Sequence, residues 1–145
     1  MAKPRARIQK QSLSGNTSSG IPIQQDVPDG NDARPLLRFT HVNTNKYCLS
    51  KCKKQDIVAL MALFKKIEER TWKQIYATAG KGYGKHGVAY ERVSTTALPT
   101  LPSTTPKDAQ PFELRANDSV RIFAYRGDDN TCNLLFFDPK HRILS

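Results

Sequence analysis

The chain reads VRIFAYRGDDNTCNLLFF from Val120 to Phe137. Residues 120–126 alternate between apolar and polar side chains, as a half-buried β-strand does. Gly127-Asp128-Asp129-Asn130 follows them and is typical of a hairpin turn. The run 132–137 is almost wholly apolar, as in a strand covered on both faces. This stretch therefore predicts an antiparallel β-hairpin at the centre of the domain.

The segments before this hairpin extend the predicted sheet. Residues 112–115 alternate again and predict a strand paired with 120–126. Residues 35–42 carry β-formers and predict a first strand, which opens the folded part of the chain. The intervening stretch 94–111 is rich in Ser, Thr and Pro and predicts a loop.

Two helices are predicted between the first strand and this loop. One apolar stripe recurs at helical spacing and is expected to face the core; it consists of Ile57, Leu60, Met61, Phe64 and Ile67. Thr71-Trp72-Lys73-Gln74 has the form of a capping box and predicts a second, short helix. The predicted fold class is α+β, with a small antiparallel sheet packed by two N-terminal helices.

The first part of the chain differs in composition from the rest. Residues 1–34 are rich in Ser, Gly, Pro, Gln, Asn and Asp, and their few apolar residues follow no period. Such a segment buries too little apolar surface to offset its ordering entropy. We therefore expect residues 1–34 to be a disordered basic and polar tail, and residues 35–145 to be the folded domain.

The charge balance is strongly positive. Lys and Arg number 23 and Asp and Glu 13, which gives a net charge of +10. Such a field attracts polyanions, so nucleic acid is the first candidate partner and an acidic protein the second. A charge that only aids solubility is the alternative. No apolar run or leader-like segment predicts a membrane span or secretion, so the protein is expected to be cytoplasmic, with no membrane partner.

Neither the cysteines nor the glycine-rich segment predicts a cofactor site. Cys48, Cys52 and Cys132 are expected to be reduced thiols, since they are few and odd in number. Residues 80–87 are Gly-rich but do not match a P-loop, because Ala79 and His86 stand where that motif needs Gly and Ser or Thr. The loop can still approach a phosphate backbone, or be an ordinary surface loop. No metal or cofactor is expected.

The strand order and the C-terminal run resemble the RelE/ParE superfamily of small bacterial toxins, including phage-type HigB-like proteins. The likeness is carried by residues 112–115, by the arginine-bearing strand 120–126, and by the apolar strand that ends in Asp138-Pro139-Lys140-His141-Arg142. The resemblance implies a RelE-like fold and a toxin of a toxin–antitoxin system. Its partners would be mRNA, the ribosome and a cognate antitoxin.

The resemblance also implies an endoribonuclease that needs no metal. Cleavage by the 2′-hydroxyl requires a base, an acid and fixed positive charge on the phosphorane. Arg121 matches the family's mid-strand arginine, and His141 is the best acid or base because imidazole titrates near neutrality. Lys140 and Arg142 would hold phosphate. The expected RNA-binding residues are Lys53, Lys54, Lys65, Lys66, Lys81, Lys85, Arg115, Tyr125 and Arg126.

Two other interpretations fit the same residues. The chain can be a non-catalytic nucleic-acid-binding or regulatory module, or a domain that binds an acidic protein. The strand arginines can also be an ordinary solvent face. Antiparallel pairing brings residues before a turn opposite those after it, so Arg121 is expected near the run 140–142. Under the toxin hypothesis, replacing Arg121 and His141 together by Ala abolishes toxicity and leaves the fold intact.

Overall fold

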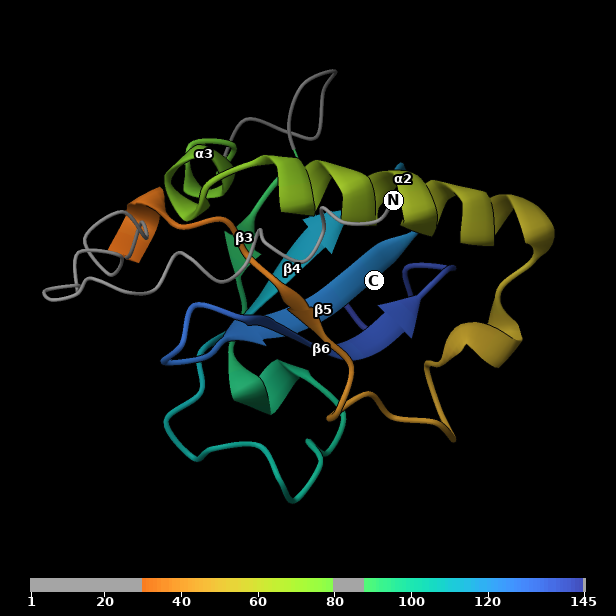
Figure 1. Cartoon of the computed structure of the whole chain (residues 1–145). Helices are drawn as coiled ribbons and strands as arrows, with labels where there is room; N and C mark the ends of the chain where they lie inside the picture. The colour runs from red at the N-terminus through yellow and green to blue at the C-terminus, as the bar shows by residue number, and fades with distance from the viewer. Residues whose placement is uncertain (1–29, 80–87, 145) are drawn as a thin grey trace, which may run out of the picture.

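The computed structural model describes residues 30–79 and 88–144, which form a five-stranded sheet with one main helix along one side (Figure 1). The strands lie in the order β2-β6-β5-β4-β3. Their bounds are β2 (Leu37–Arg38), β3 (Glu91–Arg92), β4 (Pro111–Arg115), β5 (Arg121–Arg126) and β6 (Cys132–Asp138). The helices are η3 (Gly30–Asp32), η4 (Leu49–Lys51), α2 (Lys54–Glu69), α3 (Trp72–Tyr76) and η5 (Thr95–Ala97).

The β5–β6 hairpin is confirmed. The backbone N–H of Gly127 donates to the carbonyl of Thr131 at 2.9 Å and closes the turn. A Cβ on Gly127 would lie 2.9 Å from the side chains of both Asn133 and Asp129, so a larger residue at this position would displace the polar side chains of the turn. All of β6 is buried, as its apolar sequence predicted.

The sheet is mixed, which corrects the prediction of an antiparallel sheet. β2 pairs in parallel with β6, whereas the other neighbouring strands are antiparallel. The strand predicted over 35–42 is also too long, because the backbone turns after Arg38, where the N–H of Val42 donates to the carbonyl of Phe39 at 3.1 Å. The Phe39 ring then packs edge-on against Phe64 of α2, with centroids 6.0 Å apart.

The helix α2 forms where the apolar period predicted a helix, but its buried face differs from the predicted one. The buried side chains are Leu60, Leu63 and Ile67, which share one face at helical spacing. Ile57 and Met61, which were expected to face the core, are 36% and 54% exposed. The face of α2 that contacts the core therefore includes Leu63, which was not part of the predicted stripe.

The expectation of two N-terminal helices is wrong, since the structure has one main helix and α3 spans five residues. The capping box itself is confirmed: the N–H of Gln74 donates to Thr71 Oγ1 at 3.2 Å, and the N–H of Thr71 donates to Gln74 Oε1 at 2.9 Å. The helix ends in a tighter turn, in which the N–H of Thr78 donates to the carbonyl of Ile75 and the N–H of Ala79 to the carbonyl of Tyr76, both at 3.0 Å. The hydroxyl of Thr78 donates to the same Ile75 carbonyl at 2.7 Å.

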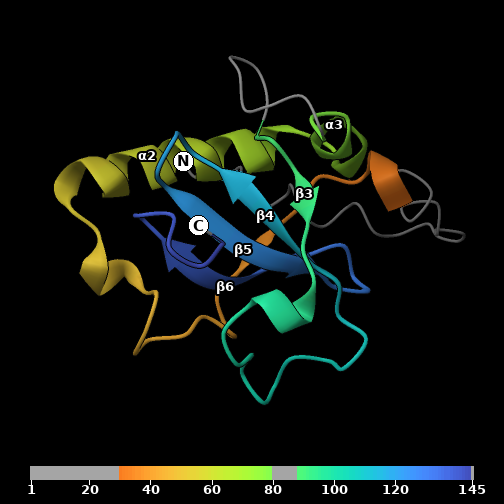
Figure 2. The same ribbon diagram turned by 180° about the vertical axis from the view of Figure 1, so that it is seen from behind.

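Two apolar clusters cover the two faces of the sheet. The larger one joins α2 and α3 to alternate residues of the central strands, such as Ile122 and Ala124. The smaller one contains Phe123, Tyr125, Leu135 and Phe136 on the other face, under the β3–β4 segment and the residues after β6. Figure 2 shows this β3–β4 segment on the side of the sheet away from α2.

The folded domain begins earlier than the predicted boundary at residue 35. Residues 30–32 form η3, and Ala33 is buried in the larger cluster. The carbonyl of Ala33 accepts a hydrogen bond from the N–H of Trp72 at 3.0 Å, which ties this segment to α3. The tail predicted over residues 1–34 thus loses residues 30–34, and residues 1–29 lie outside the described part of the chain.

The three cysteines are free thiols, and Cys132 is fully buried. Burial raises the pKa of the Cys132 thiol to about 12, because the interior disfavours the thiolate. Since thiolates are the reactive form, we expect Cys132 to resist a thiol reagent at neutral pH until the domain unfolds. Peptide mapping after labelling in buffer and in denaturant checks this, and labelling of Cys132 in the folded protein would contradict it.

Candidate nucleic-acid interface

A basic pocket lies where β6 ends. Its volume is about 410 Å³, and it is lined by Lys46, Tyr47, Lys51, Asp138, Pro139, Lys140 and Arg142. Four of these side chains are cationic and one is a carboxylate. Within the described part of the chain, Lys46, Lys51 and Lys140 have no carboxylate within ion-pair distance. The pocket therefore presents an excess of positive charge that is not neutralised by those salt bridges.

The wall that carries Lys46 is held against β6 by backbone hydrogen bonds. The N–H of Asn43 donates to the carbonyl of Leu135 at 3.1 Å, and the N–H of Phe137 donates to the carbonyl of Tyr47 at 2.7 Å. Residues 43–47 therefore continue along the edge of β6 beyond the end of β2. This pairing places Lys46 and Tyr47 beside residues that are about 90 positions later in the chain.

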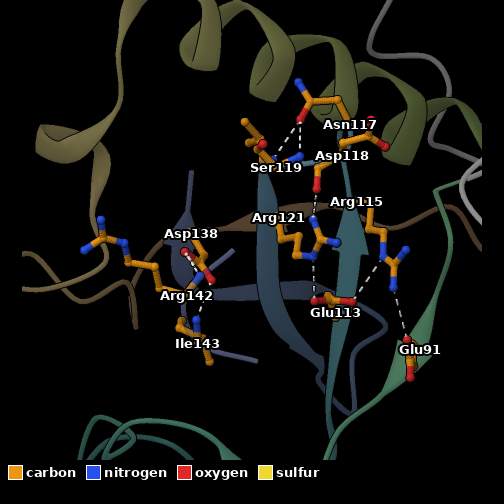
Figure 3. Close-up of polar contacts among 11 residues, drawn as sticks. Glu91, Glu113, Arg115, Asn117, Asp118, Ser119, Arg121, Asp138, Arg142 and Ile143 are labelled. Carbon is orange, nitrogen blue, oxygen red and sulfur yellow. Dashed lines mark hydrogen bonds and ion pairs between the residues drawn. The ribbon is translucent and has the colours of Figure 1, made fainter. Parts of the chain in front are cut away.

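Asp138 organises the opposite wall of the basic pocket. It is 1% exposed, and its two carboxylate oxygens accept hydrogen bonds from the N–H groups of Arg142, at 3.0 Å, and Ile143, at 2.8 Å (Figure 3). These bonds fold the segment after β6 back on itself, so that Lys140 and Arg142 reach the same pocket. The carboxylate is engaged by the backbone, which reduces its competition for the lysines.

Two residues at this end of the sheet have left-handed backbones. The φ angle of Tyr47 is 50° and that of His141 is 53°. Such angles are uncommon for residues with a side chain, and they cluster at binding sites and tight turns. The pocket thus combines a group of cationic side chains with a constrained backbone.

Arg121, the predicted transition-state arginine, lies inside the domain and not in the basic pocket. Its side chain is 4% exposed, and its Nε atom is 3.1 Å from Oε2 of Glu113, which is 2% exposed. The two atoms form an ion pair, although the N–H is not aligned for a hydrogen bond. Arg121 Nη1 also donates to the carbonyl of Asp118 at 2.7 Å. Figure 3 shows this guanidinium between Glu113 and the turn before β5.

This ion pair is part of a row of charges on β3, β4 and β5. Arg115 contacts the other oxygen of Glu113 at 3.4 Å and reaches Glu91 at 3.6 Å. Burial lowers the pKa of the Arg121 guanidinium, and the nearby charge of Glu113 opposes that shift. Both Arg121 and Arg115 therefore neutralise carboxylates on the strands of the sheet.

The predicted catalytic residues are only partly brought together. Arg121 pairs in register with Asp138, so it lies beside the start of the run 140–142, as expected. Lys140 and Arg142 line the basic pocket. His141 is half-buried and is not among the residues that line it. The structure therefore places two of the four predicted catalytic residues in one site.

The predicted RNA-binding residues are spread over several parts of the structure. Lys53, Lys54 and Lys65 are exposed, and Lys66 is half-buried, at or along α2. Tyr125 is buried, and burial raises the pKa of its hydroxyl. Lys81 and Lys85 lie outside the described residues. Of the predicted RNA-binding residues that the structure describes, none lines the basic pocket.

The guanidinium of Arg126, another predicted RNA-binding residue, is bound within the domain. It donates to Asn31 Oδ1 at 2.8 Å, to the hydroxyl of Tyr76 at 3.0 Å and to the carbonyl of Gly30 at 2.8 Å. It also lies 4.8 Å from the centre of the Trp72 ring. Its contacts join η3, α3 and β5.

Sequence reasoning missed Tyr47 and Asp138 as site residues, and it did not single out Lys46 or Lys51. The Asp-Pro pair after an apolar strand is one signal that could have identified Asp138, because Asp side chains often bind backbone N–H groups a few residues later. Nothing in the sequence places residues 43–47 against β6, since that contact is long-range.

Comparisons with known proteins give no identification: no family model, curated protein or solved structure matches the chain. Among residues 30–79 and 88–144, no helix has the length and apolar character that crossing a membrane requires. Within the same residues, His, Cys, Asp and Glu form no group of three or more that could hold a metal ion. The site is therefore interpreted from its own geometry and charge.

Proposed function

We propose that this protein binds RNA and holds its phosphate backbone in the basic pocket. The observation that carries the proposal is the convergence of Lys46, Lys51, Lys140 and Arg142 around one hollow. Backbone contacts supply most of the affinity in sequence-independent binding, because each neutralised phosphate releases counterions. RNA is the partner that the toxin resemblance implies, and a ribosome-bound transcript is one form of it.

The chemistry of the cations suits a phosphate. An arginine presents a planar fork that matches two phosphate oxygens, whereas lysines act as mobile point charges. The single carboxylate, Asp138, is already hydrogen-bonded to two backbone N–H groups. It therefore fixes the loop that carries Lys140 and Arg142.

Neutralising two lysines of the basic pocket tests the proposal. In Lys51→Gln/Lys140→Gln we expect affinity for a single-stranded RNA to fall about tenfold at moderate salt. The slope of log affinity against log salt concentration should become shallower by about 1.4, since two single-strand phosphate contacts are lost. Fluorescence anisotropy over a salt series measures both quantities.

The matched control removes the same charge elsewhere. Lys65→Gln/Lys73→Gln replaces two exposed lysines on α2 and α3, away from the basic pocket. This variant should retain most of the wild-type affinity and slope. Equal losses in both double variants would contradict a localised phosphate site and favour a general basic surface, and no binding by the wild-type protein would overturn the proposal.

Ribonuclease activity is the second candidate, and the observation that favours it is that Lys140 and Arg142 share the basic pocket. Arg121 would have to leave Glu113 to reach a phosphate, so this chemistry would depend on the pocket cations. The same RNA, recovered after incubation, distinguishes the two functions. Intact RNA supports binding without cleavage. Discrete cuts that are lost in Lys51→Gln/Lys140→Gln support the toxin hypothesis and, with it, a cognate antitoxin as partner.

A further inference from the structure

A second cleft lies at the other end of the central strands. Its volume is about 570 Å³, and it is bounded by the end of α3, β3, the segment before β4 and the turn after β5. The size is within the range of small-molecule sites. Its lining includes the half-buried rings of Tyr76 and Tyr90 and the charged side chains of Arg92, Arg126, Asp108 and Asp128.

Aromatic rings form one wall of this cleft. Tyr90 stands between Tyr76 and Phe112, with ring centroids 4.9 Å and 5.0 Å away. Behind them Trp72 contacts both Tyr76, at 5.8 Å, and Phe112, at 5.9 Å. The backbone N–H of Tyr90 donates to Thr78 Oγ1 at 3.1 Å. The two neighbouring rings and this hydrogen bond together fix the position of the Tyr90 ring.

The polar groups of the cleft are balanced in charge. Arg92 and Arg126 oppose Asp108 and Asp128, and the amide oxygen of Gln110 accepts a hydrogen bond from Arg92. Burial raises the pKa of the Tyr90 hydroxyl, which therefore stays protonated as a neutral donor at neutral pH. A phosphate gains little in such surroundings, because the carboxylates oppose it. A neutral planar ring with hydrogen-bond donors and acceptors gains from both the aromatic wall and the polar groups.

We infer that this cleft binds a nucleobase of the RNA whose backbone the basic pocket holds. The inference rests on the proposed function and adds a second contact to it. Along β5, Arg121 pairs with Asp138 at the pocket end, and Arg126 lines the cleft five residues later. This separation is about 17 Å at the rise of a β-strand. The two sites therefore take different nucleotides of one single strand, whose unstacked bases are free to bind aromatic side chains.

The first test compares two ligands of equal charge. A short single-stranded RNA and an abasic strand of the same length differ only in their bases. We expect the wild-type protein to bind the base-containing strand about tenfold more tightly, as stacking of a base on an aromatic ring predicts. Tyr90→Phe keeps the ring and should keep this preference. Tyr90→Leu removes the ring and should bind both strands equally.

The outcomes separate this inference from the proposed function. Equal binding of both strands by the wild-type protein, or a preference retained in Tyr90→Leu, overturns the base site and leaves the phosphate site intact. If neither strand binds, the proposed function fails, and adenosine, which carries no phosphate, tests the cleft alone. Titration calorimetry should then show that adenosine binds the wild-type protein and binds Tyr90→Leu more weakly. No binding of adenosine by the wild-type protein would overturn the inference.

Discussion

Arg121→Ala is expected to lower the free energy of unfolding by about 3 kcal/mol, at the lower end of the range for removing one partner of a buried ion pair. Glu113 is 2% exposed, and the substitution removes the countercharge that lies 3.1 Å from its Oε2 atom. Arg115 still reaches the other oxygen at 3.4 Å and keeps the loss from being larger. The carbonyl of Asp118 also loses its donor. Urea denaturation followed by Trp72 fluorescence measures the change.

Arg115→Ala is the matched control, because it removes an arginine from the same carboxylate. Its side chain is 25% exposed, and its partner Glu91 is largely exposed to water. We expect a loss of about 1 kcal/mol, since solvent weakens such pairs. If Arg121→Ala destabilises the protein no more than Arg115→Ala does, the stabilising role given to the buried pair is wrong.

This result bears directly on how the toxin hypothesis should be tested. The expectation that replacing Arg121 and His141 together leaves the fold intact does not agree with the buried position of Arg121. Loss of toxicity in that double variant would report loss of stability. His141→Ala alone, or the lysine variant of the basic pocket, leaves the Glu113–Arg121 pair in place and tests function separately.

The strands near the C-terminus could be predicted because their pattern is local. Alternation in 112–115 and 120–126, and the apolar run in 132–137, each agree with a strand of the structure. The role of Arg121 could not be predicted in the same way. Its partner Glu113 lies on the neighbouring strand, two residues before Arg115, which is directly opposite Arg121. Only the register and the covering segments decide that this pair is buried.

The same distinction applies to the candidate site. Lys140 and Arg142 were predicted as phosphate ligands from the local basic run, and they line the basic pocket. Lys46 and Lys51 complete it because residues 43–47 follow the edge of β6, which depends on the parallel pairing of β2 with β6. That pairing joins segments far apart in the chain, and the predicted antiparallel sheet did not contain it.

Arg126→Ala is expected to lower the free energy of unfolding by about 2 kcal/mol. The guanidinium accounts for hydrogen bonds to Asn31, Tyr76 and the carbonyl of Gly30, and it lies over the Trp72 ring at 4.8 Å. These bonds are partly exposed to water, so their acceptors find new partners and the loss stays below that of Arg121→Ala. The change should also loosen residues 30–34, which these bonds hold against α3.

Arg126→Lys is the informative comparison for these guanidinium contacts. A lysine keeps the charge and the contact with Trp72, but its ammonium cannot form the planar set of bonds that a guanidinium forms. We therefore expect Lys to restore only part of the stability. The backbone N–H of Trp72 donates to the carbonyl of Ala33, so its hydrogen exchange reports on how firmly residues 30–34 are held. Unchanged exchange in Arg126→Ala would show that the buried Ala33 holds residues 30–34 in place without the arginine.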